Sequence, residues 1–166
     1  MNERKESTTS IILEYARVIV LTVIATFIFL QFVQISRVNG SSMENTYFQN
    51  NIVLIDKVFY KHSQPKRNDI IIVDYDDGLD DTLIIKRVVA VGGDHLDIKN
   101  NEVYIDRIKE NYIKENMNTE DLSIDIPKGK VFVMGDNRNH SLDSRKLGYF
   151  DFDNDVIGKV FFKIPL

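Results

Sequence analysis

Cysteine is absent from the 166-residue sequence, and histidine occurs only three times. Without cysteine the chain has no disulfide framework, no zinc–thiolate site and no cysteine nucleophile. This absence does not fix the compartment, because a domain with an adequate core is stable outside the cell without disulfides. His62, His95 and His140 are scattered and have no HxxxH-type spacing. We therefore expect no bound metal and no cofactor.

The chain also lacks an excess of basic residues. Its 21 lysines and arginines against 25 acidic residues give a net charge of −4, which argues against nucleic acid as a partner. A hydrophobic content of 43% with 28% charged residues is ordinary for a globular core and argues against wholesale disorder. The length accommodates one domain and one small extra element.

Charge is missing altogether from one segment near the N-terminus. Residues 18–33 read VIVLTVIATFIFLQFV and carry no charged side chain over 16 residues. A helix needs about 20 residues to cross the hydrocarbon core of a bilayer, and Arg17 can lengthen the usable span by reaching toward the headgroups. We therefore predict one transmembrane anchor over residues 18–34, with the lipid bilayer as a partner.

Two other interpretations of this segment remain open. A buried core helix normally has a polar face, which residues 18–33 lack. A cleaved secretory signal has an apolar region of about 7–15 residues, and Val38-Asn39-Gly40 places a small residue before a break. The apolar length favours a retained anchor. Whether the segment is a retained anchor or a cleaved signal, we expect the domain that follows it to be exported.

The distribution of positive charge predicts the orientation of the anchor. Residues 1–17 contain three lysines and arginines, whereas the 20 residues after Val33 contain only Arg37. By the positive-inside rule, residues 1–17 form a cytoplasmic N-terminal tail and residues 35–166 an extracytoplasmic domain. The expected localisation is a cell membrane, crossed once.

After the anchor, short runs rich in β-branched and aromatic residues alternate with turn residues. Asn100-Asn101 separates two such runs, 96–98 and 103–105, which is typical of a β-hairpin. Residues 109–123 are polar and fit a loop or a helical turn equally well. We expect a mainly antiparallel β domain with a small excursion at about 98–126. The predicted strands cover residues 52–55, 69–73, 83–91, 102–105, 131–134 and 156–164.

Two segments contain one candidate catalytic residue each. Residues 40–46 include Ser42, which would be held close to the bilayer surface, although a serine after a glycine-containing pair is more often part of a turn. Residues 83–94 include Lys86, which shares one strand face with aliphatic neighbours. If that face is interior, desolvation lowers the pKa of the amine, as a lysine general base requires. A Lys-Arg pair protecting an exposed sheet edge is the alternative.

A third segment, residues 134–145, is dense in groups that hydrogen-bond with the backbone and with one another. A charge-assisted pair between Asp143 and Arg145, or between Asp136 and Arg145, would fix this loop. Ser141 carries a hydroxyl able to contact a neighbouring catalytic group. We reject a Ser/His/Asp triad within the segment, because triad members converge from separate segments whereas adjacent side chains point apart.

Taken in order, these segments resemble the type I signal peptidases. That family has serine and methionine, then any residue, proline and threonine around its nucleophile, and Ser42-Met43-Glu44-Asn45-Thr46 matches except at the proline. Its lysine begins a Lys-Arg-hydrophobic run ending in Gly-Asp, as Lys86-Arg87 and Gly93-Asp94 do here. Its most specific box is Gly-Asp-Asn-Arg, two residues, Ser, one residue and Asp-Ser-Arg, and residues 135–145 match every defining position. The resemblance runs from the anchor to about Lys163.

The resemblance implies a membrane-bound serine endopeptidase of bacterial type that cleaves N-terminal signal peptides from exported preproteins. It implies Ser42 as the nucleophile, Lys86 as the general base and Ser141 as the hydroxyl that orients the lysine amine. The backbone N–H of Ser42 would meet the oxyanion. The implied fold is an antiparallel sheet or partly open barrel, similar to that of the self-cleaving SOS repressors.

The resemblance also implies supporting and substrate-binding residues. The loop that carries Ser141 would be held by Asp136, Asp143 and Arg145. Preproteins would be cut after a small residue, with small residues at the last and third-last positions of the signal, and their extended segment would pair with a strand edge. The residues assigned to substrate binding are Met43, Ile85 and Val38.

Three positions depart from the family pattern. Asn45 replaces the proline near the nucleophile, and Gly92 stands where proline is usual before Gly-Asp. Because proline pre-sets φ, we expect both changes to loosen the site and to affect rate or substrate range rather than reaction class. Gly40 stands where some members have a hydroxyl that contacts the oxyanion.

Two alternative functions remain, one a second kind of enzyme and the other non-catalytic. A related Ser/Lys protease that cleaves itself or one dedicated partner would usually follow a DNA-binding domain, and this chain has an anchor instead. A catalytically weak or inactive membrane-tethered homologue would bind peptides or assemble with an active peptidase. The two missing prolines favour this second alternative, and the retained Ser42 and Lys86 oppose it.

Overall fold

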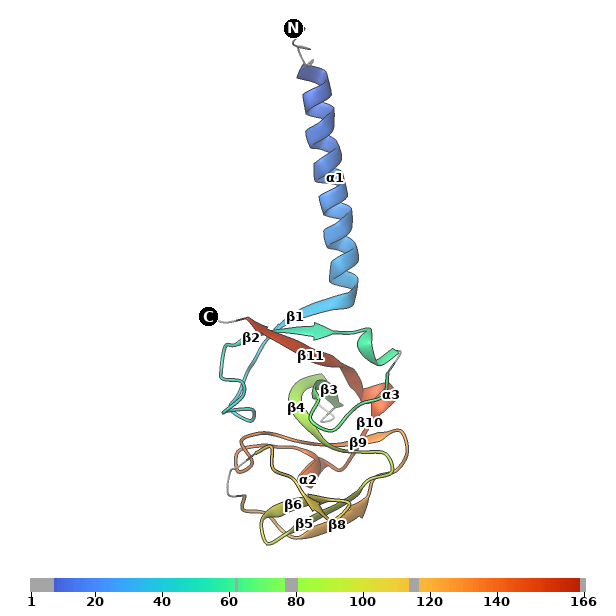
Figure 1. Ribbon diagram of the computed structural model, residues 1–166. Coiled ribbons are helices and arrows are strands. Elements are labelled where there is room, and N and C mark those ends of the chain that lie inside the picture. Colours follow the sequence, from blue (N-terminus) through green and yellow to red (C-terminus); the bar gives the residue numbers. More distant parts are fainter. Residues whose placement is uncertain (1–7, 62, 77–80, 114–116, 165–166) are drawn as a thin grey trace.

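The computed structural model describes residues 8–61, 63–76, 81–113 and 117–164 (Figure 1). One long helix, α1 (Thr8–Phe32), extends away from a body made of two antiparallel β-sheets. No residue of α1 is buried, and its 25 residues have a mean hydropathy of 2.1 over the most apolar 18-residue window. The helix is thus long and apolar enough to cross a membrane, and it is not the core helix of this body.

The bounds of α1 differ from those of the predicted anchor. The helix begins at Thr8, ten residues before the predicted start, and ends at Phe32. Val33 and Gln34, predicted as the end of the anchor, instead form the start of β1 (Val33–Arg37) and pair with β2 (Ile52–Asp56). The uncharged run therefore continues from the helix into a strand, so the absence of charge does not mark the boundary between them. Residues 1–7 of the predicted tail lie outside the described residues.

The larger sheet has seven strands in the order β1-β2-β11-β3-β4-β9-β10. No pairing joins its end strands β1 and β10 in the described chain, so the sheet is open rather than a closed barrel. The mainly antiparallel β fold predicted from sequence is confirmed, as are five predicted strands of this sheet. The strands not yet bounded are β3 (Ile70–Asp76), β4 (Asp81–Val91), β9 (Lys130–Met134), β10 (Phe150–Asp151) and β11 (Val156–Ile164).

The smaller sheet holds the excursion from the main domain. Its order is β7-β6-β5-β8, from β5 (His95–Lys99), β6 (Glu102–Ile105), β7 (Ile108–Lys109) and β8 (Leu122–Asp125). The hairpin predicted at Asn100-Asn101 is confirmed, and both asparagines have positive φ, 51° and 63°, as a tight two-residue turn requires. The excursion begins at His95, slightly before the predicted start. Polar residues 109–123 end in β8, a strand that the sequence did not reveal.

An apolar cluster beneath the end of β1 fixes the position of the loop that carries Ser42. Its buried members are Val38, Met43, Tyr47, Val53, Ile55, Ile72, Ile85 and Val160. A second cluster packs between β3, β4, β9 and β10, and a third joins the two sheets. Short helices complete the body: η1 (Phe59–Lys61), α2 (Ser144–Leu147) and α3 (Phe152–Asp155). The loop with Ser42 thus rests on the same apolar layer as the strand that carries Lys86.

Candidate active site

Ser42 and Lys86 meet in the structure although 44 residues separate them. Lys86 Nζ donates a hydrogen bond of 2.9 Å to Ser42 Oγ and another of 3.0 Å to the carbonyl of Ile85. Ser42 lies in the loop after β1, and Lys86 lies in β4. A hydroxyl within hydrogen-bond reach of an amine is the arrangement that an amine base needs to activate a serine.

Lys86 is buried, with only 3% of its surface exposed. Burial lowers the pKa of its amine from 10.5 to about 8, and the negative charge of Asp143 opposes part of that change. A substantial fraction of the amine is therefore neutral at mildly alkaline pH. The predicted burial of Lys86 is confirmed, and the alternative of a solvated lysine on an exposed sheet edge is wrong.

Ser42 is held in a tight turn. Glu44 N–H donates to the carbonyl of Ser41 at 3.0 Å, and Tyr47 N–H donates to the carbonyl of Met43 at 2.8 Å. Met43 is 1% exposed and anchors the turn in the apolar cluster. Because Met43 is buried, the turn is fixed relative to the sheet while the neighbouring Ser42 stays half-buried at the surface of the cavity described below.

The loop after β9 is organised by a buried ion pair between Asp143 and Arg145. The guanidinium donates from Nε and Nη2 to the two carboxylate oxygens, both at 2.8 Å, and Gly135 N–H adds a hydrogen bond of 2.9 Å. Burial raises the pKa of Asp143, but the Arg145 guanidinium and the hydrogen bonds from Gly135 N–H and Ser141 together outweigh burial and hold that pKa below its usual value. Of the two pairs considered for Arg145, the structure contains the one with Asp143.

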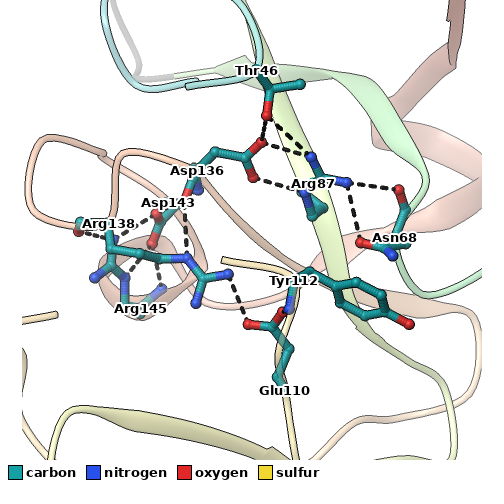
Figure 2. Close-up of polar contacts among 10 residues, drawn as sticks. Thr46, Asn68, Arg87, Glu110, Tyr112, Asp136, Arg138, Asp143 and Arg145 are labelled. Carbon is teal, nitrogen blue, oxygen red and sulfur yellow. Dashed lines mark hydrogen bonds and ion pairs between the residues drawn. The ribbon is translucent and has the colours of Figure 1, made fainter. Parts of the chain in front are cut away.

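Asp136 pairs with Arg87 instead (Figure 2). Arg87 donates from Nε and Nη2 to the two oxygens of the fully buried Asp136 carboxylate, both at 2.7 Å, and Thr46 Oγ1 donates to the same carboxylate. This contact joins β4, the loop after β9 and the turn that carries Ser42. Sequence reasoning gave Arg87 no such role. The Lys86-Arg87 dipeptide could have indicated this role. Because adjacent residues of a strand point to opposite faces, Arg87 must find its partners on the face away from Lys86.

A second buried ion pair was also missed. Arg138 donates from Nη2 to Glu110 at 3.0 Å and from Nε to the carbonyl of Gly135 at 3.1 Å. Both side chains are almost fully buried, and Figure 2 shows the pair beside the Asp143–Arg145 pair. It fastens the loop after β9 to the excursion. Nothing in the polar sequence around Glu110 marked it as the partner of a residue 28 positions away.

Ser141 lies beside the turn of the candidate nucleophile. A Cβ added at Gly135 would be 2.3 Å from Ser141 Oγ and 2.4 Å from the carbonyl oxygen of Ser42, so only glycine fits between them. The Ser141 hydroxyl is buried beside the Asp143 carboxylate, whose pKa it helps to lower, and no hydrogen bond joins it to the Lys86 amine in the part of the chain that the structure describes. The structure thus brings Ser141 to the site, and the Lys86 amine is held by Ser42 and Ile85.

A cavity of about 220 Å³ lies directly beside Ser42 and Lys86. It is lined by residues 36–39 at the end of β1, residues 82–86 of β4, Ser42, Val53 and Ile72. Val38 and Ile85, both predicted to contact substrate, line it. Met43 does not, because its side chain is buried in the apolar cluster beneath. Met43 supports the turn from below, and its assignment to substrate binding stays a prediction.

The cavity lies between two strand segments that are each paired on one side. β1 pairs with β2, and no strand among the described residues pairs with its other edge. Residues 83–86 of β4 pair with β3, whereas pairing with β9 begins at Arg87. Backbone groups on the free edges are available to an extended peptide lying in the cavity.

The backbone at Asn45 and Gly92, where the family pattern has proline, does not accommodate a proline ring. Asn45 has φ of 82°, far from the value of about −65° that a proline ring imposes. At Gly92 a Cβ would approach the Cα of Lys128 and the carbonyl of Pro127 to 2.9 Å. Asparagine and glycine therefore fit the local backbone, and the expected effect of both changes on rate or substrate range stays a prediction.

Comparisons with known proteins find one family over most of this chain. A family model described as "Signal peptidase, peptidase S26" matches residues 12–164. Signal peptidase I P of Bacillus subtilis subsp. natto is 31% identical, over 95% of this chain and 91% of that protein. Signal peptidase I U of Bacillus subtilis strain 168 is 34% identical, over 73% of this chain and 70% of that protein. The crystal structure of a signal peptidase I from Enterococcus faecalis V583 shares the fold, with a TM-score of 0.50, 24% identity and coverage of 60% of this chain and 98% of that one.

Proposed function

Since this chain belongs to the signal peptidase family, peptidase S26, we propose how its residues perform the reaction of a signal peptidase I. The chain is a serine endopeptidase that cleaves signal peptides from exported preproteins. The observation that supports Ser42 and Lys86 as the catalytic pair is their 2.9 Å contact, made by an amine that burial keeps partly neutral.

In the first step, Ser42 Oγ attacks the scissile carbonyl carbon while neutral Lys86 Nζ takes the hydroxyl proton. The carbonyl electron pair becomes an oxyanion. The Ser42 N–H, which donates no hydrogen bond within the described residues, is the donor we assign to it. Lys86 then returns the proton to the leaving amine, which is the new N-terminus of the mature protein. Water, activated by the same amine, releases the signal peptide from Ser42.

We propose that the substrate binds as an extended segment in the cavity between β1 and β4. Its backbone would pair with the free edges of both strands. A volume of about 220 Å³, lined by Val38 and Ile85, suits small side chains on the residues before the cut. This explains why a small residue would be required at the last and third-last positions of the signal.

We propose that α1 is retained as a single membrane anchor, with residues 1–17 in the cytoplasm and residues 35–166 outside. Ser42 follows the end of α1 by ten residues, so this arrangement keeps the site near the outer membrane surface. The absence of cysteine allows a direct test. In intact cells a membrane-impermeant maleimide should label Asn154→Cys, whose position is exposed, and should label Ser7→Cys only after permeabilisation. The opposite pattern would reverse the orientation.

The catalytic roles are tested with the full chain in detergent and a preprotein that has an Ala-x-Ala junction. Wild type and Lys128→Ala, a control at an exposed lysine, should cut once after the final alanine, as mapped by mass spectrometry. Ser42→Ala and Lys86→Ala should not cut. Folded wild type that cuts none of several such substrates would favour the peptide-binding, non-catalytic homologue, and full activity in Ser42→Ala would place the nucleophile elsewhere.

A further inference from the structure

Asn137 holds the two peptide groups that flank Ser42. Its side-chain Nδ2 donates a hydrogen bond of 3.1 Å to the carbonyl of Ser41, and its backbone N–H donates one of 3.0 Å to the carbonyl of Ser42. The carbonyl of Ser42 also packs against Gly135. The loop after β9 therefore contacts the backbone of the nucleophile directly, in addition to its ion pairs elsewhere.

The contact with Ser41 fixes the direction of the Ser42 N–H. The carbonyl of Ser41 and the N–H of Ser42 belong to one planar trans peptide group, in which C=O and N–H point in opposite directions. The carbonyl accepts from both Glu44 N–H, at 3.0 Å, and Asn137 Nδ2. Rotation of this peptide would break both hydrogen bonds to its oxygen, so they keep its N–H directed away from Asn137.

The carboxamide of Asn137 is itself oriented by His140. His140 Nδ1 lies 3.1 Å from Asn137 Oδ1, and because a carboxamide oxygen only accepts, the ring nitrogen is the donor. This contact assigns the oxygen to His140 and leaves the NH₂ group for Ser41. His140 N–H also donates to the carbonyl of Asn137 at 3.1 Å, which closes the loop on itself.

We infer that Asn137 is a positioning residue that aims the Ser42 N–H at the developing oxyanion. The inference rests on the proposed function, in which that N–H is an oxyanion donor. A donor already fixed in direction stabilises the transition state without reorganising as charge develops. The hydrogen bond to the Ser41 carbonyl also polarises the shared peptide and strengthens its N–H as a donor. This contribution has added weight here because Gly40 carries no hydroxyl.

The expected signature is a loss in kcat with little change in KM. Oxyanion contacts form only in the transition state, so Asn137→Ala should lower kcat by about 10- to 100-fold, less than direct removal of a donor. A peptide aldehyde forms a tetrahedral adduct with Ser42, so its affinity should fall by a similar factor. Binding of the uncleaved substrate, measured in Ser42→Ala with and without Asn137→Ala, should stay the same.

Asn139→Ala is the matched control. It removes a carboxamide from the same loop, one that accepts from Asn118 N–H, and should leave kcat and aldehyde affinity near wild type. Wild-type kcat in folded Asn137→Ala, with Ser42→Ala inactive, would overturn the role of Asn137 alone. Equal losses of kcat in Asn137→Ala and Asn139→Ala would show that the loop has loosened, as would a rise in KM as large as the loss of kcat. Either result would also overturn the positioning role of Asn137. Cleavage by Ser42→Ala would instead overturn the proposed function.

Discussion

The Lys86 amine donates a hydrogen bond of 2.9 Å to the Ser42 hydroxyl from a position that is 97% covered by protein. The same burial that makes the amine a usable base also makes it costly to protonate in the folded state. Asp143 opposes this effect, because its charge raises the pKa of Lys86. The balance of these two effects places the pKa of the Lys86 amine at about 8.

The first prediction concerns the pH dependence of cleavage. Only the neutral amine accepts a proton from Ser42, and the pKa of Lys86 is about 8. We expect kcat/KM for a peptide substrate to rise about tenfold per pH unit well below pH 8 and to level off above it. A rate that declines between pH 6 and pH 8 would contradict Lys86 as the base.

The second prediction concerns the stability of a variant without the amine. Folding lowers the pKa of Lys86 from 10.5 to about 8, so below pH 8 the folded protein must bury an ammonium ion. Between those values the unfolded chain binds a proton that the folded chain has lost, so wild-type stability rises with pH. Lys86→Met should therefore raise the free energy of unfolding by about 3 kcal/mol at pH 7, with the gain fading by pH 10.5.

Thermal unfolding of the full chain in detergent at several pH values measures this effect. Lys128→Met is the matched control, because Lys128 is exposed and its replacement should leave the pH dependence unchanged. If Lys86→Met were less stable than wild type at pH 7, burial of the ammonium ion would not be the dominant effect of Lys86 on the free energy of unfolding.

The third prediction concerns the pair that joins β4 to the turn with Ser42. Asp136 is fully buried and receives two hydrogen bonds from Arg87 and one from Thr46. Arg87→Met leaves a buried carboxylate without its cation, so we expect a loss of about 3–5 kcal/mol in the free energy of unfolding. Arg145→Met should act similarly through Asp143, whereas Arg107→Met, at an exposed position, should have little effect in the same unfolding assay. A change of under about 1 kcal/mol in Arg87→Met would contradict this account.

Much of the fold followed from local pattern. The strands that contain Ile85 or Val133 are runs of β-branched residues between turn residues, and the Asn100-Asn101 hairpin was visible because that pair adopts positive φ readily. β1 was missed because Val33 continues the uncharged run of the helix. The two-residue β7 and β10 are too short to leave a periodic signal.

The site was predictable only in part, for physical reasons. Ser42 and Lys86 were recognised from their motifs, and the aliphatic neighbours of Lys86 indicated its burial. The partners of Arg87 and Arg138 were not, because an ion pair between residues 28 or 49 positions apart depends on how loops pack. Met43 was assigned to substrate binding, and in this turn its side chain is buried in the apolar cluster beneath Ser42.

The last prediction concerns Asn45, which stands where the family pattern quoted in the sequence analysis has proline. Asn45→Pro restores that pattern, yet the φ of 82° at Asn45 is one that proline does not adopt. Asn45→Pro should therefore distort the turn that carries Ser42 and lower kcat/KM at least tenfold, with a lower unfolding temperature as well. Asn45→Gly, which accepts positive φ without strain, should keep near wild-type values in both measurements and serves as the control. If Asn45→Pro were as active and stable as wild type, the turn would be free to take the proline conformation, and the positive φ would not be a requirement of catalysis in this chain.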